Sequence, residues 1–168
     1  MWYKTFALLF VLVLGTACSH KGGDWQVEPL YKNNVNQKID SIYVATIGGD
    51  KGVYLHNELS KRIKTNSNPK YRLESKFTIT EKNLAIGNDS SVTRKQVNVK
   101  VNFKLVDITG SGKVIKTFTT FGFANYSTSS TAYLSEVSKE HATRRSLSIA
   151  SNSAILRISL MFKNGIIK

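Results

Sequence analysis

The chain has 168 residues, 41% of them hydrophobic, so it can bury an apolar core and is not a disordered polymer. Its formal charge is +13, and only Lys4 of the basic residues precedes Cys18; such a charge attracts polyanions such as nucleic acid, anionic lipid or phosphorylated glycolipid, unless it serves solubility alone. Cys18 is the single cysteine, which excludes an intrachain disulfide, and the length suits one domain after a leader is removed.

Residues 1–17 have the features of a secretory signal peptide. Lys4 supplies a short positive region, and the apolar stretch Phe6–Leu14 is about half as long as the roughly 20 residues of a membrane-spanning helix. The segment Gly15–Cys18 resembles the lipobox of bacterial lipoproteins, although Gly15 replaces the usual leucine. The resemblance implies cleavage before Cys18 and lipid on its thiol, which would anchor the chain in a membrane. Ser19 follows, rather than the Asp that retains lipoproteins at the inner membrane, so the periplasmic side of the outer membrane is expected. The alternative is an ordinary signal peptide that leaves an unmodified cysteine.

Residues 18–38 are polar and contain glycine, so we expect a lipidated N-terminus followed by a tether. Ile39–Ile47 is short and rich in β-branched residues, which predicts a strand. Gly48–Gly52 breaks that strand. Val53–Ile63 then predicts a short amphipathic helix, because its apolar residues recur every four positions at Leu55, Leu59 and Ile63.

Alternation of apolar and polar residues is clearest in the middle of the chain. Tyr71–Thr80 and Val97–Leu105 both alternate, which predicts strands with one buried and one wet face. The segment Glu81–Gln96 between them is long for a hairpin loop, although part of it can extend the strands. Gly110–Gly112 predicts a second turn, and Val114–Phe123 a third strand of this meander.

The last third of the chain predicts a long helix. Ser127–Thr131 can cap its start, and Ala132–Phe162 contains no Gly or Pro. A core-facing stripe follows at helical spacing: Leu147, Ala150, Ala154, Ile158 and Met161. The order β-α-β-β-β-α predicts an α+β fold for residues 39–168, a single two-layer domain with two helices on one face of a four-stranded mixed sheet.

No catalytic or metal-binding pattern is found. His20 lies in the tether, and His56 and His141 lie on separate predicted helices, whereas a zinc site needs three or four ligands. No nucleophile motif and no glycine-rich nucleotide loop occurs. We therefore expect no enzyme, no cofactor and no metal.

The basic residues suggest a surface for phosphate. Lys76, Lys100 and Lys104 fall on the exposed faces of the alternating strands, Arg144 and Arg145 on the last helix, and Lys82, Arg94 and Lys95 beside the long loop. Nucleic acid is not expected as a partner, because Phe77 and Phe103 have core parity and cannot stack on bases. Phosphorylated lipid is the polyanion that the periplasm offers, and Lys82, Arg94 and Lys95 are candidates to bind it, against the alternative that these are solvated strand-end charges.

The chain resembles the LptE family of lipopolysaccharide-assembly lipoproteins in the order and spacing of its segments. The resemblance is carried by the lipobox and by the segments Glu28–Tyr31, Ile42–Val44, Tyr71–Leu73, Val101–Asp107 and Leu160–Phe162. It implies an outer-membrane lipoprotein that plugs the β-barrel LptD, assists its assembly and binds lipopolysaccharide. Two basic residues tied to lipopolysaccharide in characterised members would fall near Asp89 and Leu134–Ser135, which are not basic, so no family site residue is carried over. Lys82, Arg94 and Lys95 are predicted to bind lipopolysaccharide in their place, on their charge and loop position alone. A free-standing periplasmic lipoprotein that binds peptidoglycan or another anionic glycopolymer is the alternative.

Overall fold

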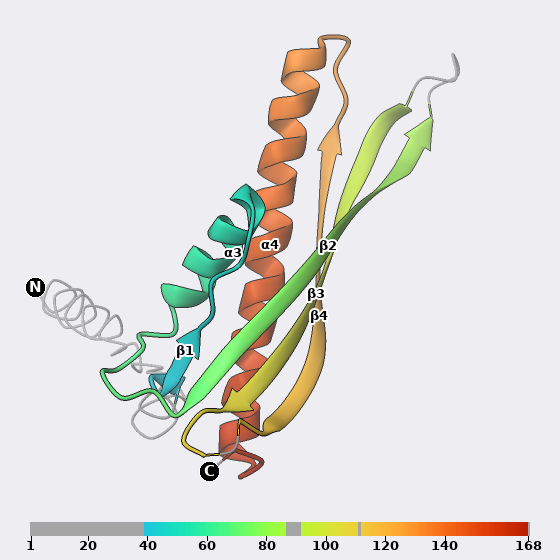
Figure 1. The fold of residues 1–168 in the computed structure, drawn as a ribbon. Coiled ribbons are helices and arrows are strands. Elements are labelled where there is room, and N and C mark those ends of the chain that lie inside the picture. The colour runs from blue at the N-terminus through green and yellow to red at the C-terminus, as the bar shows by residue number, and fades with distance from the viewer. Residues whose placement is uncertain (1–38, 87–91, 111, 168) are drawn as a thin grey trace, which may run out of the picture. The chain divides into compact units, whose positions relative to one another are not determined.

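In the part of the chain that the structure describes, four strands and two helices follow one another in the predicted order β-α-β-β-β-α (Figure 1). The structure is a computed structural model, and it describes residues 39–86, 92–110 and 112–167. The elements are β1 (Ile42–Val44), α3 (Asp50–Ser60), β2 (Tyr71–Ile86), β3 (Val92–Asp107), β4 (Val114–Ser127) and α4 (Ala132–Lys163).

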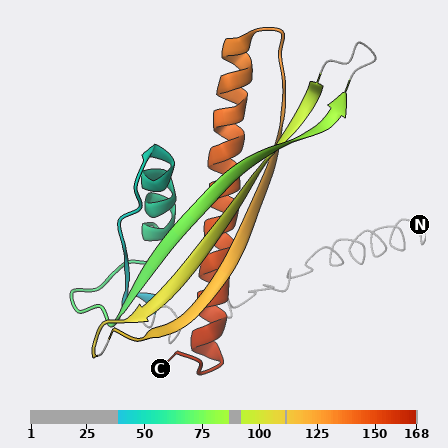
Figure 2. The same ribbon diagram turned by 45° about the vertical axis from the view of Figure 1, so that its right-hand side comes forward.

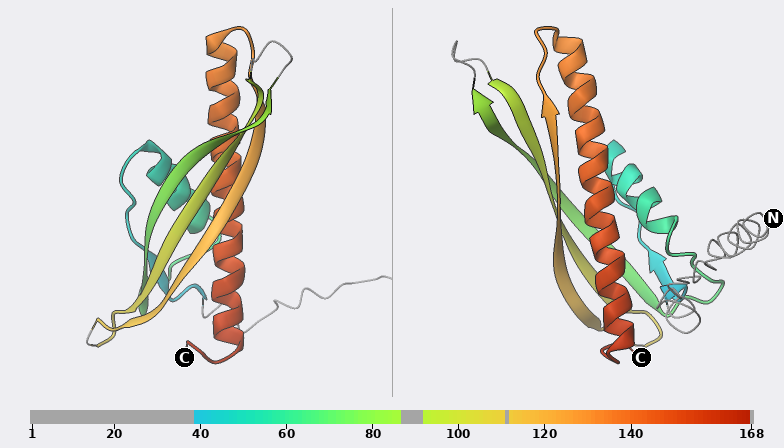
Figure 3. Two further views of the ribbon diagram at one scale, coloured as in Figure 1. Left: turned by 90° about the vertical axis from the view of Figure 1, so that its right-hand side faces the viewer. Right: turned by 180° about the vertical axis from the view of Figure 1, so that it is seen from behind.

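The strands form one mixed sheet in the order β1-β2-β3-β4. β1 pairs in parallel with the start of β2, with Ile42 opposite Tyr71, whereas β2, β3 and β4 are antiparallel neighbours. Seen from behind, both helices lie on the same side of the sheet (Figure 3), with α4 packed on β3 and β4 and α3 packed on α4. The predicted α+β architecture, with a four-stranded mixed sheet and two helices on one face, is confirmed.

The core lies between the helices and the odd-numbered residues of β2 and β3. Val97, Val99, Val101, Phe103 and Leu105 are all buried, as their alternation predicted. They meet the predicted stripe of α4, which is also buried throughout, and Leu55 and Leu59 of α3 are buried with it, as is Ile63 after the end of the helix. Burying this apolar surface supplies the main driving force for folding.

Gly122 of β4 allows α4 to approach the sheet closely. A Cβ at this position would lie 1.8 Å from the carbonyl oxygen of Ser146 and 3.1 Å from the nitrogen of Ala150. Beside it, the hydroxyl of Thr120 donates a 2.9 Å hydrogen bond to the carbonyl of Ala150. Glycine therefore sets the distance between helix and strand at this point.

Glu81–Ile86 and Val92–Gln96 extend the two strands, as expected for part of the segment Glu81–Gln96. β2 continues to Ile86 and β3 begins at Val92, and the two strands stay paired along this stretch apart from register shifts near Asn83–Ile86. The hairpin projects well beyond β1 and α3 (Figure 2). The apolar core ends below it, and polar residues such as Lys82 and Lys95 occupy both faces, so the regular alternation that marks a half-buried strand is absent there.

The predicted start of the last helix is correct, but its cap differs from the expectation. Thr131 occupies the N-cap position and makes no side-chain capping hydrogen bond. Instead, the hydroxyl of Ser135 inside the helix accepts from the Ser129 amide at 2.8 Å and donates to the Ser129 carbonyl at 3.1 Å. The serine-rich segment is therefore held from within α4.

Candidate functional site

The sheet face that points away from the helices, called the outer face below, is strongly basic. Its residues are even-numbered on β2 and β3 and odd-numbered on β4, since direct partners across a sheet share a face. Within the part of the chain that the structure describes, this face carries a single carboxylate, Glu74, and six exposed cations: Arg72, Lys76, Lys82, Arg94, Lys100 and Lys104. The exposure predicted for Lys76, Lys100 and Lys104 is confirmed.

Glu74 neutralises only part of this charge. Its carboxylate lies 2.7 Å from Arg72 Nη2 and 3.3 Å from Lys104 Nζ. Partial burial alone would raise the pKa of Glu74, but the hydrogen bonds and charges of Lys104 and Arg72 outweigh this effect and hold the pKa below its ordinary value. Glu74 is therefore ionised at neutral pH. Among the described residues, Lys76 and Lys100 make no ion pair.

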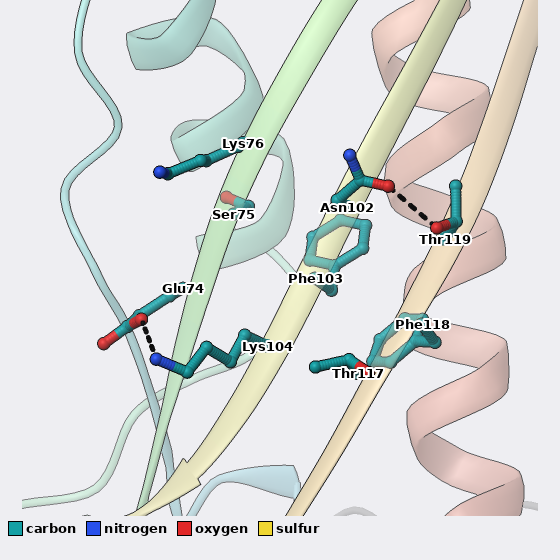
Figure 4. A pocket seen from close by; sticks show the side chains of 9 residues that line it. All are labelled: Glu74, Ser75, Lys76, Asn102, Phe103, Lys104, Thr117, Phe118 and Thr119. Atoms are coloured by element: carbon teal, nitrogen blue, oxygen red, sulfur yellow. Dashed lines mark hydrogen bonds and ion pairs between the residues drawn. The ribbon is translucent and has the colours of Figure 1, made fainter. Parts of the chain in front are cut away.

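A pocket of about 540 Å³ lies at the centre of this charge, between β2, β3 and β4 (Figure 4). Lys76 and Lys104 line it beside Glu74, and the hydroxyl of Thr119 donates to Asn102 Oδ1 across it at 2.8 Å. Lys76 is directly opposite Asn102 in the register, so Lys100 and Lys104 are its diagonal neighbours on β3, roughly 7–8 Å away by sheet geometry. These separations are between Cα atoms, and lysine side chains are long enough for neighbouring ammonium groups to bind one polyvalent anion such as a phosphate pair.

Two phenylalanines of β4 add an apolar strip beside these cations. Phe121 and Phe123 are 50% and 52% exposed, and their rings stack with centroids 6.3 Å apart. Phe121 is directly opposite Lys100 in the sheet. This pair was not predicted, because alternation in the sequence assigned buried and exposed faces only to the segments of β2 and β3. The sequence does contain a signal for it. In Thr119–Phe123, both phenylalanines alternate in step with the polar Thr119, which places them on the same face of the strand as that residue.

The three residues predicted to bind lipopolysaccharide do not converge on one surface. Lys82 and Arg94 lie on the outer face near the end of the hairpin, since Lys82 is opposite Gln96 and Arg94 shares the parity of that residue. Lys95 has the opposite parity and pairs with the buried Tyr126 of β4. Lys82 and Arg94 therefore extend the basic outer face, whereas Lys95 belongs to the side of the helices.

Lys95 lies beside a polar cluster above the apolar core. Glu81 accepts a 2.7 Å hydrogen bond from the Tyr126 hydroxyl and forms a 2.7 Å ion pair with Lys139 of α4. The hydrogen bonds from Lys139 and Tyr126 lower the pKa of Glu81, and the charge of Lys95 adds to the effect. Burial and the Glu81 carboxylate raise the pKa of Tyr126. The cluster joins β2, β4 and α4, which is a structural role.

The other basic and histidine candidates are engaged elsewhere. Arg144 pairs with Glu140 at 2.9 Å, and Arg145 reaches the edge of β4. His56 Nδ1 lies 3.3 Å from the Ala45 carbonyl, and His141 is exposed on α4. Within residues 39–86, 92–110 and 112–167, no His, Cys, Asp and Glu side chains gather as a metal site would require. His20 and Cys18 lie outside the described residues.

Comparison with known proteins identifies relatives of the chain. The family model LptE, described as lipopolysaccharide-assembly, matches residues 39–158. An uncharacterized protein of Rickettsia prowazekii (strain Madrid E) is 29% identical over 77 residues, which are 46% of this chain and 49% of that protein, so the match spans about half the length of the relative.

Solved structures share the fold. A candidate lipoprotein from Caulobacter crescentus CB15 matches with a TM-score of 0.63 at 18% identity, over 77% of this chain and 96% of that chain. Rare lipoprotein B from Shewanella oneidensis matches with a TM-score of 0.55 at 11% identity, over 74% of this chain and 96% of that chain. At these identities the likeness is one of fold.

Proposed function

We propose a function on the premise that the chain belongs to the LptE family of lipopolysaccharide-assembly proteins. In this proposal it is an outer-membrane lipoprotein that plugs the β-barrel LptD, assists the assembly of that barrel and binds lipopolysaccharide. Lipid on Cys18 would hold it on the periplasmic side of the membrane. None of the helices that the structure describes is long and apolar enough to cross a membrane.

The observation that carries the lipopolysaccharide part is the outer face, where unpaired cations lie beside exposed phenylalanines. A lipid A headgroup offers phosphates next to acyl chains, so it needs both kinds of contact. Lys76 and Lys100 would bind phosphate through charge-assisted hydrogen bonds, and Phe121 would cover apolar surface next to them. Lys82 and Arg94 continue the same face toward the end of the hairpin and would take a second anionic group.

The assignment of Lys82 and Arg94, but not Lys95, to the binding face is tested by substituting them separately. Mature protein without Cys18 would be titrated with lipopolysaccharide as wild type, as a Lys82→Ala/Arg94→Ala double variant and as a Lys95→Ala variant. We expect at least a roughly tenfold loss of affinity for the double variant that persists at moderate salt, since a lost charge-assisted hydrogen bond costs about 1.5–3 kcal/mol, and little change for Lys95→Ala. Wild-type affinity in the double variant would remove Lys82 and Arg94 from the site.

The partner is tested by affinity purification of the lipidated chain from detergent-solubilised outer membrane. Recovery of LptD in a one-to-one ratio supports the barrel plug. Co-sedimentation with the murein sacculus, without LptD, would support the free-standing glycopolymer-binding lipoprotein instead.

A further inference from the structure

β4 forms one edge of the sheet, and its odd-numbered residues turn their main-chain groups outward. The hydrogen bond from the Ala45 amide to the Leu73 carbonyl shows that odd-numbered residues of β2 face β1. Within a strand, main-chain groups of successive residues point to opposite neighbours. Even residues of β2 therefore bond to even residues of β3, and odd residues of β3 to even residues of β4. The amides and carbonyls of Phe121 and Phe123 consequently face away from the sheet.

Two arginines of α4 close the ends of this edge. Arg157 Nη1 donates to the carbonyl of Thr119 at 2.9 Å, and Arg145 Nη2 donates to the carbonyl of Asn125 at 3.2 Å. Between them α4 advances about 18 Å at 1.5 Å per residue, and β4 advances about 20 Å at 3.4 Å per residue. Helix and strand therefore run antiparallel and in step from one arginine to the other.

The outward-facing main-chain groups between the two arginines have no hydrogen-bond partner among the described residues. Among the described residues, none outside the β3–β4 ladder bonds to the amide or carbonyl of Phe121 or Phe123. Native proteins commonly protect the edge strand of a sheet from further pairing with charged side chains. Here the arginine side chains bond to the edge only at Thr119 and Asn125. The uncovered stretch is called the edge window below.

The side chains beside the edge window are suited to an extended chain. Phe121 and Phe123 flank it on the outer face. On the side of the helix, Ile149 and Ser153 lie between the two arginines at intervals of four residues, so all four side chains are on one face of α4. Ile149 and Ser153 therefore lie alongside the edge window. Ile149 is 39% exposed. Apolar contact is thus available on both faces of an added strand.

We propose that the edge window docks an extended segment of the barrel partner as an additional β-strand. The segment would carry small or β-branched apolar residues at its centre and a carboxylate toward each end. Its main chain would pair with Phe121 and Phe123, and alternate side chains would contact their rings or Ile149. The carboxylates would meet Arg145 and Arg157, each of which has further guanidinium N–H groups beyond the one it uses. This inference rests on the proposed function, because it names the surface through which the chain binds LptD.

Hydrogen exchange measures the docking directly. The lipidated full chain would be purified alone and in complex with LptD, and exchange of individual amides would be compared. We expect the amides of Phe121 and Phe123 to exchange at least about ten times more slowly in the complex. The amide of Thr120 is the internal reference, because it points toward β3 and should be protected in both states.

A pair of variants at Phe123 separates the main chain from the side chain. Phe123→Thr removes the ring and keeps the amide, whereas Phe123→Pro removes both, and proline is tolerated on an edge where the amide faces outward. We expect Phe123→Pro to bind LptD about five- to tenfold more weakly than Phe123→Thr, with similar melting temperatures for the free variants, since one net hydrogen bond is lost.

The outcomes distinguish this inference from the proposed function. If the complex forms but Phe121 and Phe123 exchange as in the free chain, and the two Phe123 variants bind equally, the edge window is not a docking site and the barrel plug stands. If no complex with LptD forms at all, the proposed function fails and the inference fails with it.

Discussion

Gly122→Ala should destabilise the domain severely, because α4 lies against this glycine. The new Cβ would stand 1.8 Å from the Ser146 carbonyl oxygen, about 1.6 Å short of the distance at which ordinary contact begins. The obstacle is helix backbone, which no side-chain rotation can relieve. α4 must therefore retreat from β4 along this part of the interface.

The cost follows from what that retreat breaks. Thr120 would lose its 2.9 Å hydrogen bond to the Ala150 carbonyl, and Ser146 its 3.3 Å hydrogen bond to the Val97 carbonyl. Each such bond contributes about 0.5–1.5 kcal/mol net, and overpacking a well-packed interface costs about 1–3 kcal/mol. Together they predict a loss of roughly 2–6 kcal/mol from a total stability that is typically only about 5–15 kcal/mol.

Urea unfolding followed by circular dichroism measures this loss, and Gly48→Ala is the matched control. A Cβ at Gly48 meets nothing within 4 Å, so that variant should change the free energy of unfolding by less than about 0.5 kcal/mol. If Gly122→Ala and Gly48→Ala unfold at the same urea concentration, the close approach of α4 to β4 is wrong.

Three further outcomes are expected. Phe103 is 2% exposed, so Phe103→Ala should lower the free energy of unfolding by roughly 3–5 kcal/mol. Lys104 is exposed, so Lys104→Ala should lower it by under about 0.5 kcal/mol. Equal losses in urea titrations would mean that the buried and exposed faces of the sheet are assigned wrongly. Glu81 has a lowered pKa, so its ion pair stabilises the fold above the unfolded pKa and is lost as the pH falls through the lower folded value. Glu81→Gln should therefore cost stability at pH 7 and little at about pH 3, and a pH-independent difference between the two proteins would contradict this. Cys18→Ala should yield an unprocessed precursor that takes up no labelled palmitate, and a wild type that never takes it up would exclude lipidation.

The sequence predicted the parts of the fold in which burial imposes a period. Val97–Leu105 alternates because one face of β3 is buried under α4, and the Leu147–Met161 stripe of α4 recurs at helical spacing for the same reason. Both patterns are local, so they can be recognised without knowing which elements meet. The order of these elements then sufficed for the two-layer architecture.

The ends of the strands and the composition of the site could not be predicted in this way. Beyond the core, Lys82 on the outer face and Lys95 on the side of the helices are both polar, so nothing in the pattern there separates a strand from a loop. Glu81 and Lys139 meet only because the fold brings β2 and α4 together, which no spacing in the chain reveals. The division of Lys82, Arg94 and Lys95 between two faces depends on the register, which the sequence left open.

The most direct test of the central claim is lipopolysaccharide binding with matched changes of charge. Lys76→Ala/Lys100→Ala removes two cations from the outer face, and Arg62→Ala/Lys64→Ala removes two exposed cations from the segment after α3. If the outer face binds lipopolysaccharide, the first variant should lose at least about tenfold in affinity at moderate salt while the second stays close to wild type. Equal losses in the two variants would mean diffuse attraction by net charge and would contradict a binding site on the outer face.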